Sequence, residues 1–240
     1  MSHSVTRSLI LFAFSAGAIG NAISQSGGSL DRYFPVRVGE SRTYSVSREW
    51  TDGSGPNLVN KHSRSSYTET TVGKQVVNGG LEFFEIRRTP GASIHALCSG
   101  DPWEASSRAP DETEDTRYRL AVDHSRIYVV CDSKELEEMK SSAKKDEYAD
   151  FVFPLRLGSA WGADAATLKR KDHMYQWIVA KSLQTMTAGG HLYSNCYEVD
   201  FRTLPDDEKR WLCDGVGLVA TEYTHHGTMN HYRVELTQIK

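Results

Sequence analysis

Apolar and polar residues alternate along much of this chain. Between Arg42 and Trp50, Tyr44 and Val46 share one set of alternate positions with Trp50, and the positions between them are mostly polar. A two-residue period puts apolar side chains on one face of a β-strand. Similar short runs occur at 65–77, 81–88, 92–98, 116–122, 126–131, 173–186, 191–202 and 218–223, and Tyr232, Val234 and Leu236 alternate near the end.

Turn-forming residues separate these runs at short intervals. Examples are Asn78-Gly79-Gly80, Pro90-Gly91 and Thr187-Ala188-Gly189-Gly190. The gaps leave little room for the crossover helices that parallel strands need, so the pattern favours antiparallel pairing. We therefore predict a mainly β fold, built on a curved antiparallel sheet, in a single domain over residues 23–240.

Two segments depart from the strand pattern. Residues 101–115 carry two prolines and several acids without the spacing of an EF-hand, which favours a solvated loop over a cation site. Residues 132–148 combine a capping-box-like start at Asp132 with an apolar stripe at Leu136, Met139 and Ala143. This second segment predicts one short surface helix packed on the sheet.

A six-residue motif occurs twice. Phe34-Pro35-Val36-Arg37-Val38-Gly39 returns as Phe153-Pro154-Leu155-Arg156-Leu157-Gly158, and a strand-like run follows each copy. Proline fixes φ and glycine accepts positive φ, so the motif suits a corner at a strand entry. If the echo reflects a repeat, the domain consists of two related β units that share one core, with a half boundary near residue 150.

The N-terminus has the pattern of a secretory signal peptide. A short segment with one Arg precedes an apolar run over residues 8–20, and Gly20 and Ala22 supply the small residues of a cleavage site. The run is shorter than the ~20 residues of a membrane-spanning helix. An uncleaved N-terminal anchor is the alternative. We expect residues 1–22 to be removed, leaving a soluble exported protein, periplasmic or secreted, with no stable membrane span.

The charge of the chain argues against nucleic acid as a partner. The full chain has a formal net charge of -3, and loss of the single Arg in the leader gives -3 - 1 = -4. A mildly acidic protein lacks the basic surface that recruits phosphates.

Four cysteines in an exported chain predict disulfides, because the compartment is oxidising and no CxxC pair is present. Sequence alone permits three pairings. We favour Cys98 with Cys131 and Cys196 with Cys213, because each pair closes a modest loop between neighbouring strand-like segments. Free buried cysteines are the alternative.

Residues 215–220 match the letters of a dinucleotide-binding fingerprint. That fingerprint needs a following helix and an acid about 20 residues later. Here a β-prone segment follows and only a short stretch remains, so Gly215 and Gly217 are interpreted as structural turn or bulge residues. No cofactor is predicted.

The histidines near the end were considered as metal ligands. His225, His226 and His231 could gather with His191, but strand alternation puts His225 and His226 on opposite faces. A solvated turn is therefore favoured over a metal site.

The familiar catalytic motifs are missing from the sequence. It contains no Gly-x-Ser-x-Gly elbow, His-Glu-x-x-His or P-loop, and no catalytic residue is assigned. Five tryptophans could line a sugar or lipid groove, but filling a β core is the commoner role of such residues.

Several short motifs together resemble a group of exported bacterial β-rich proteins of uncharacterised function. They are the two Phe-Pro-x-x-x-Gly copies, the Thr187–Gly190 turn before Cys196, and Trp211 followed by Gly215-Val216-Gly217-Leu218-Val219. The chain departs from the group at Cys213-Asp214, where Ala-Pro is expected, and at Arg42, where an aromatic residue is usual. The resemblance implies an exported β-rich fold and supplies no site residues.

Three functions remain open from the sequence. The first is a non-enzymatic exported domain that binds a ligand or protein partner or serves the cell envelope. The second is a periplasmic carrier that holds an apolar ligand, such as an acyl chain, in its curved sheet. The third is a hydrolase with a dispersed site, for which the sequence supplies no positive residue evidence.

Overall fold

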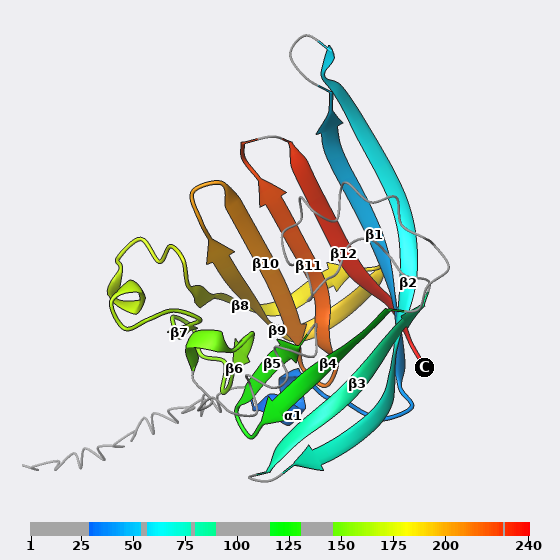
Figure 1. Cartoon of the computed structure of the whole chain (residues 1–240), viewed down its shortest axis with the longest axis vertical. Helices are drawn as coiled ribbons and strands as arrows, with labels where there is room; N and C mark the ends of the chain where they lie inside the picture. Colours follow the sequence, from blue (N-terminus) through cyan, green and yellow to red (C-terminus); the bar gives the residue numbers. More distant parts are fainter. Residues whose placement is uncertain (1–28, 54–56, 78–79, 90–115, 131–145, 228) are drawn as a thin grey trace, which may run out of the picture.

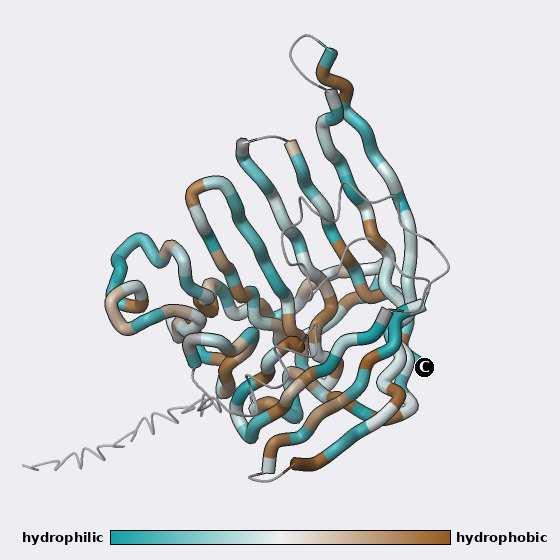
Figure 2. Tube along the Cα trace, in the orientation of Figure 1, coloured by the Kyte–Doolittle hydropathy of each residue, from teal (hydrophilic) through white to brown (hydrophobic). Residues whose placement is uncertain are grey.

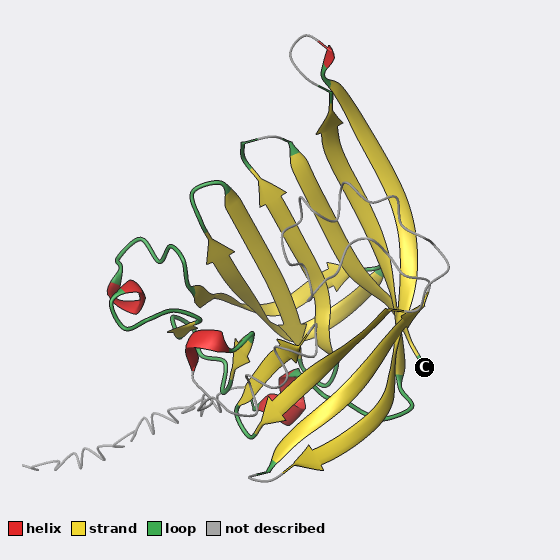
Figure 3. Ribbon diagram, viewed as in Figure 1, coloured by secondary structure: helices red, strands yellow, loops and turns green. Residues whose placement is uncertain are grey.

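The computed structural model describes residues 29–53, 57–77, 80–89, 116–130, 146–227 and 229–240 (Figure 1). The described chain is dominated by strands, and its helical turns are few and short (Figure 3). The strands are β1 (Ser41–Asp52), β2 (Val59–Val77), β3 (Leu81–Thr89), β4 (Thr116–Asp123), β5 (Arg126–Val130), β6 (Phe151–Val152), β7 (Ala160–Trp161), β8 (Trp177–Ala188), β9 (His191–Arg202), β10 (Asp206–Cys213), β11 (Gly217–His225) and β12 (Asn230–Ile239). The helical elements are α1 (Leu30–Tyr33), η2 (Asp146–Tyr148) and η3 (Thr167–Lys169).

All these strands belong to one antiparallel sheet, in the order β6-β5-β4-β3-β2-β1-β12-β11-β10-β9-β8-β7. The predicted mainly β fold with a curved antiparallel sheet is therefore confirmed. The order divides into two meanders, β1 to β6 and β7 to β12, which meet where β1 pairs with β12. In Figure 1 the first meander runs from blue to green and the second from yellow-green to red.

Most expected strands match, but three differences need correction. β2 begins at Val59, six residues before the predicted run at 65–77, and β10, which starts at Asp206, has no counterpart among the predicted runs. The strand predicted at 173–186 begins only at Trp177, because residues 173–176 form a turn in which His173 and Tyr175 have positive φ. The predicted strand at 92–98 and all but the last three residues of the predicted helix at 132–148 lie outside the described residues. Those last three residues form the 3-10 turn η2. The short helix α1 has no counterpart among the predicted elements.

The two copies of the repeated motif form the same turn. Gly39 (φ 87°) and Gly158 (φ 81°) both use the backbone conformation that glycine tolerates best. The N–H of Glu40 donates to the Arg37 carbonyl at 3.1 Å, and the corresponding bond in the second copy, from Ser159 to Arg156, is 2.9 Å.

The likeness extends into the neighbouring strands. Gly39 donates its N–H to the Thr71 carbonyl on β2, and Gly158 donates to the Val179 carbonyl on β8. Directly after each acceptor the register shifts, between Thr71 and Gly73 and between Val179 and Lys181. Turn, strand entry and bulge thus recur at matching positions, as expected of two related β units.

The buried core joins the two units. One cluster combines Phe83, Leu120 and Phe151 of the first unit with Val199 and Leu212 of the second. A second cluster lies among β1, β2 and β8 to β12 and is rich in tyrosine. Figure 2 shows that many hydrophobic stretches gather where the two units meet. The core is therefore shared between the units.

The structure contains the predicted disulfide between Cys196 and Cys213, which face one another across β9 and β10. The other proposed pair, Cys98 with Cys131, lies outside the described residues. Gly215 and Gly217 both have positive φ and frame the turn between β10 and β11. Among the described helices, none is long and apolar enough to cross a bilayer.

The β8–β9 hairpin folds back against β12. His191 Nε2 lies 2.9 Å from the carbonyl oxygen of Thr237, and the hydroxyl of Tyr193 donates to the carbonyl of Leu236 at 3.3 Å. At the tip, a Cβ added to Gly189 would lie 2.0 Å from that same Leu236 oxygen. Glycine at position 189 is therefore required by close backbone approach.

Replacing Cys196 and Cys213 together by serine should lower the free energy of unfolding by about 3 kcal/mol, because their 17-residue separation closes a loop in the unfolded chain. Urea denaturation followed by tryptophan fluorescence measures the change. Equal stability of the double variant and the oxidised protein would contradict a stabilising role for this bridge.

Gly189→Ala should destabilise the protein much more than Gly190→Ala. Both positions have positive φ, which costs a residue with a side chain about 1–2 kcal/mol, but only position 189 meets Leu236. We expect a further loss of at least ~2 kcal/mol at position 189. Similar unfolding midpoints for the two variants would show that the hairpin tip does not pack closely on β12.

Candidate functional site

One face of the sheet carries an unusual set of side chains where β10, β11, β12 and β1 lie side by side. We call it the aromatic face and define it by Tyr44, Tyr223, Tyr232 and Arg210, which register places on the same side. The opposite side of these strands carries Trp211, Glu222 and Arg233 and is called the disulfide face. Because directly paired residues point the same way, cross-strand rows can be followed along the aromatic face.

The outermost row is polar and half-exposed. Asp206 pairs with His225, His225 with Asn230, and Asn230 with Trp50. The next row crosses the same four strands and consists of Glu208 on β10, Tyr223 on β11, Tyr232 on β12 and Arg48 on β1. Both tyrosines in it are buried and stack with ring centroids 5.1 Å apart. The aromatic face therefore changes from accessible to buried over two rows.

Asp206 organises the β10–β11 side of this site. Its Oδ1 accepts hydrogen bonds from the Tyr223 hydroxyl at 2.5 Å and from His225 Nδ1 at 2.8 Å, and its Oδ2 accepts one from Thr203 at 3.2 Å. Partial burial opposes ionisation, but these bonds outweigh it and lower the pKa of Asp206. The carboxylate thus holds the imidazole and the phenol in fixed positions.

Arg48 and Trp50 form the β1 side. The guanidinium of Arg48 lies 4.9 Å from the centroid of the Trp50 ring, and its Nε donates to Asn230 Oδ1 at 3.3 Å. Both side chains are partly exposed. The site therefore presents an arginine stacked on an indole, beside an amide.

Deeper on the same face, Arg210 is buried against aromatic rings. It lies 4.1 Å from the Trp177 ring and 5.2 Å from the Phe151 ring, and it pairs with Glu208 at 2.7 Å and Asp150 at 3.5 Å. Two carboxylates offset the cost of burying this guanidinium. Arg210 belongs to the second unit and Asp150 to the first, so this ion pair also connects the units.

Asp150 precedes β6 at one edge of the sheet and is hydrogen-bonded to β5 through both its backbone and its side chain. Its N–H donates to the Ile127 carbonyl at 2.9 Å, and its Oδ2 accepts from the Val129 N–H at 2.7 Å, beyond the end of β6. Burial raises the pKa of Asp150 to about 6, and the opposing effects of Arg210 and the Val129 N–H offset this only in part.

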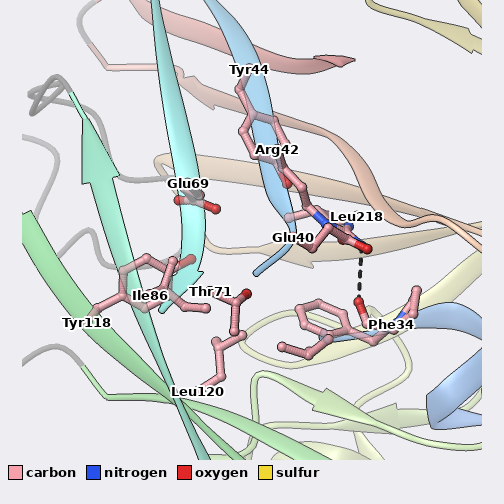
Figure 4. Close-up of a pocket in the computed structure, with 12 residues that line it drawn as sticks. Phe34, Glu40, Arg42, Tyr44, Glu69, Thr71, Ile86, Tyr118, Leu120 and Leu218 are labelled. Carbon is pink, nitrogen blue, oxygen red and sulfur yellow. Dashed lines mark hydrogen bonds and ion pairs between the residues drawn. The ribbon is translucent and has the colours of Figure 1, made fainter. Parts of the chain in front are cut away.

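A small cavity of about 40 Å³ lies where β1 to β4 meet the segment before β1 (Figure 4). Its lining combines Glu40, Arg42 and Glu69 with Tyr44 and Tyr118. A cavity of this size holds a few water molecules, far less than an acyl chain occupies.

Arg42 joins this cavity to both units. Its guanidinium donates to the carbonyls of Pro35 at 3.0 Å and Val216 at 2.7 Å, and its Nε pairs with Glu40 at 2.6 Å. In the second copy of the motif the position that matches Arg42 is Trp161, which is buried. The family resemblance led us to expect an aromatic residue at position 42, after the first copy of the motif. The chain has Arg there, and the aromatic residue occurs at the matching position after the second copy, as Trp161.

The histidines that the sequence singled out do not come together. His225 pairs with Asp206, His226 with Asp207 at 2.9 Å, and His191 with the Thr237 carbonyl, while His231 lies opposite Glu49 in the sheet. Within the described residues no group of three or more His, Cys, Asp or Glu side chains could hold a metal ion.

Sequence reasoning overlooked Arg48, Asp206, Tyr223 and Asn230. Alternation did assign Trp50 to the same face as Tyr44 and Val46, and it would have added Arg48 had the polar members of that face been followed. The partners from β10 to β12 depend on strand order, which no local pattern reveals.

Comparisons with known proteins add a weak structural likeness. No family model matches the chain, and no curated protein matches its sequence. A predicted exported protein with a YmcC-like fold from Bacteroides fragilis is 10% identical, with a TM-score of 0.41, covering 87% of this chain and 99% of that one. A predicted lipoprotein from Parabacteroides distasonis is 12% identical, with a TM-score of 0.36 and the same coverage. Similarities at this level carry no argument about function.

Asp150→Asn should remove a pH dependence of stability. The pKa of Asp150 in the folded state lies above its ordinary value of 3.8, so the folded state binds the proton more tightly than the unfolded state. This group therefore favours folding at low pH and loses that contribution as pH rises from about 4 to about 6. Wild type loses this contribution and the variant does not. The free energy of unfolding of the variant, relative to that of wild type, should therefore rise by roughly 2–3 kcal/mol between pH 4 and pH 6.

Chemical denaturation at a series of pH values measures this difference. Asp172→Asn is the control, because hydrogen bonding from Arg170 lowers the pKa of Asp172, so its contribution changes in the opposite direction. Parallel stability curves for wild type and Asp150→Asn would contradict the assignment.

Proposed function

We propose that this chain is an exported, non-enzymatic β-rich domain that binds a ligand or protein partner at the half-exposed end of its aromatic face. The observation that carries the proposal is the outer row, in which Asp206, His225, Asn230 and Trp50 stand side by side on four strands. Polar and aromatic side chains held in fixed positions at a partly open surface are typical of recognition sites.

Export is supported by two independent features. Residues 1–22 have the pattern of a signal peptide, and the disulfide between Cys196 and Cys213 is of a kind that persists in oxidising compartments. Periplasmic and secreted locations are both compatible with these features.

The cavity in Figure 4 does not favour the acyl-chain carrier. It is small, and its lining includes two carboxylates and a guanidinium, whose burial against an acyl chain would be costly. For the hydrolase, the Asp206–His225 pair resembles half of a catalytic triad. In the described chain, however, the hydrogen-bond partner of the His225 ring is Asp206, and no nucleophile is bonded to it.

Site-specific photocrosslinking in intact cells tests the proposal. A photoreactive amino acid at position 50 should crosslink a discrete envelope component, whereas the same group at Glu49, an exposed neighbour on the opposite side of β1, should not. The crosslinked protein should begin after residue 22 by mass spectrometry. Identical products from positions 49 and 50, or a leader that stays attached in the cytoplasm, would argue against it.

A further inference from the structure

Arg48 differs from the other enclosed arginines of this protein. Arg42, Arg88 and Arg210 each hold at least one carboxylate at 2.6–2.7 Å. Burial acts against their charge, but their partners outweigh it and raise the pKa of each. Arg48 makes no ion pair with any described residue, and partial burial lowers its pKa. A half-buried cation without a carboxylate is costly for a protein to keep.

Around Arg48, several donors have no acceptor among the described residues. Its Nε uses the oxygen of Asn230, so the Nη atoms of the guanidinium and the amide nitrogen of Asn230 remain as donors. Ser63 lies directly across from Arg48 on β2 and is exposed, which adds a hydroxyl. These groups come from three adjacent strands, β12, β1 and β2, on the aromatic face.

The neighbouring charges favour an anion. Lys61 lies across from Trp50 on the same face, and its ammonium is paired with Asp52, so this pair adds no net charge. Glu49 follows Arg48 in β1 but points to the disulfide face. Among the residues that the structure describes, Arg48 is therefore a cation without a carboxylate partner on the β12–β1–β2 side of this face, whereas the Asp206 carboxylate lies three strands away on β10.

We propose that Arg48, Asn230 and Ser63 form a binding site for an oxyanion group, a carboxylate, phosphate or sulfate, on a ligand whose adjoining part packs against Trp50. The planar guanidinium offers paired donors that match two oxygens of such a group. Stacking on the indole fixes the plane of the guanidinium before the ligand arrives, which reduces the entropy lost on binding. This inference rests on the proposed function, since it names the ligand chemistry for the same face.

Titration of the isotope-labelled protein with simple anions tests the site by NMR. Inorganic phosphate, sulfate and acetate are added separately at constant ionic strength, with chloride as the reference. We expect a saturable shift of the Arg48 Nε–H and Trp50 indole N–H resonances with at least one oxyanion, and the order of affinities identifies which class is preferred. No saturation with any of them, or the same shifts with chloride, overturns the proposal.

Substitutions separate a binding role from a structural one. Arg48→Gln should weaken anion binding about tenfold or more, because a charge-assisted hydrogen bond contributes at least this factor. Arg48→Lys keeps the charge without the paired donors and should bind with intermediate affinity, which also shows that the site remains folded. Arg64→Gln is the matched control, since Arg64 is exposed on β2 and lies opposite Ser47, on the disulfide face. Equal affinity of wild type and Arg48→Gln would overturn the assignment.

Crosslinking distinguishes this inference from the proposed function. If position 50 crosslinks its partner equally well in wild type and Arg48→Gln, and no oxyanion binds, the aromatic face is a binding surface but Arg48 is not an anion site. If neither position 50 crosslinks nor any anion binds, both proposals fail.

Discussion

The pairing of β1 with β12 is the interaction on which the rest of the structure depends. Nine residue pairs, from Arg42 with Ile239 to Trp50 with Asn230, join the first and last strands of the chain. Each meander alone would expose an unpaired strand edge at this point, and closing it requires contacts between residues almost 200 positions apart. This one ladder makes a single sheet of two units. It also brings Arg48 and Trp50 beside Asn230, so the candidate site does not exist without it.

Charged groups buried along this junction follow one rule with one exception. Arg88 and Arg210 lie against aromatic rings, Arg42 is held by backbone carbonyls, and each of the three pairs with a nearby carboxylate. Such pairs contribute little net stability compared with apolar residues, but breaking one would leave an isolated buried charge. Two of these arginines instead hold the units in position relative to one another, because Arg42 and Arg210 each contact both units. Arg48 stands apart from this rule at the accessible end of the same face.

The two copies of the repeated motif lead into strands at different places in the sheet, β1 at its middle and β7 at one edge. The motif turn, strand entry and bulge recur, yet β1 has twelve residues and β7 only two. The position after the turn carries Arg42 in one unit and buried Trp161 in the other. The first copy lies at the junction, where a guanidinium can reach carbonyls of both units. The second copy lies at a sheet edge, where an apolar ring fills the core.

The sequence by itself determined most of the strands, the turns and the repeated motif, and it favoured the pairing of Cys196 with Cys213, because alternation, glycine and proline chemistry and short loop closure are local properties. It also favoured a structural turn over a nucleotide loop at Gly215, and a solvated turn over a shared metal site for His225 and His226. The true start of β8 was missed, because the positive φ of His173 and Tyr175 has no signature in their side chains. Only the tertiary structure decided that Asp206, His225, Asn230, Trp50 and Arg48 belong together. Their meeting depends on the order and register of four strands, and that order is set by packing between distant parts of the chain.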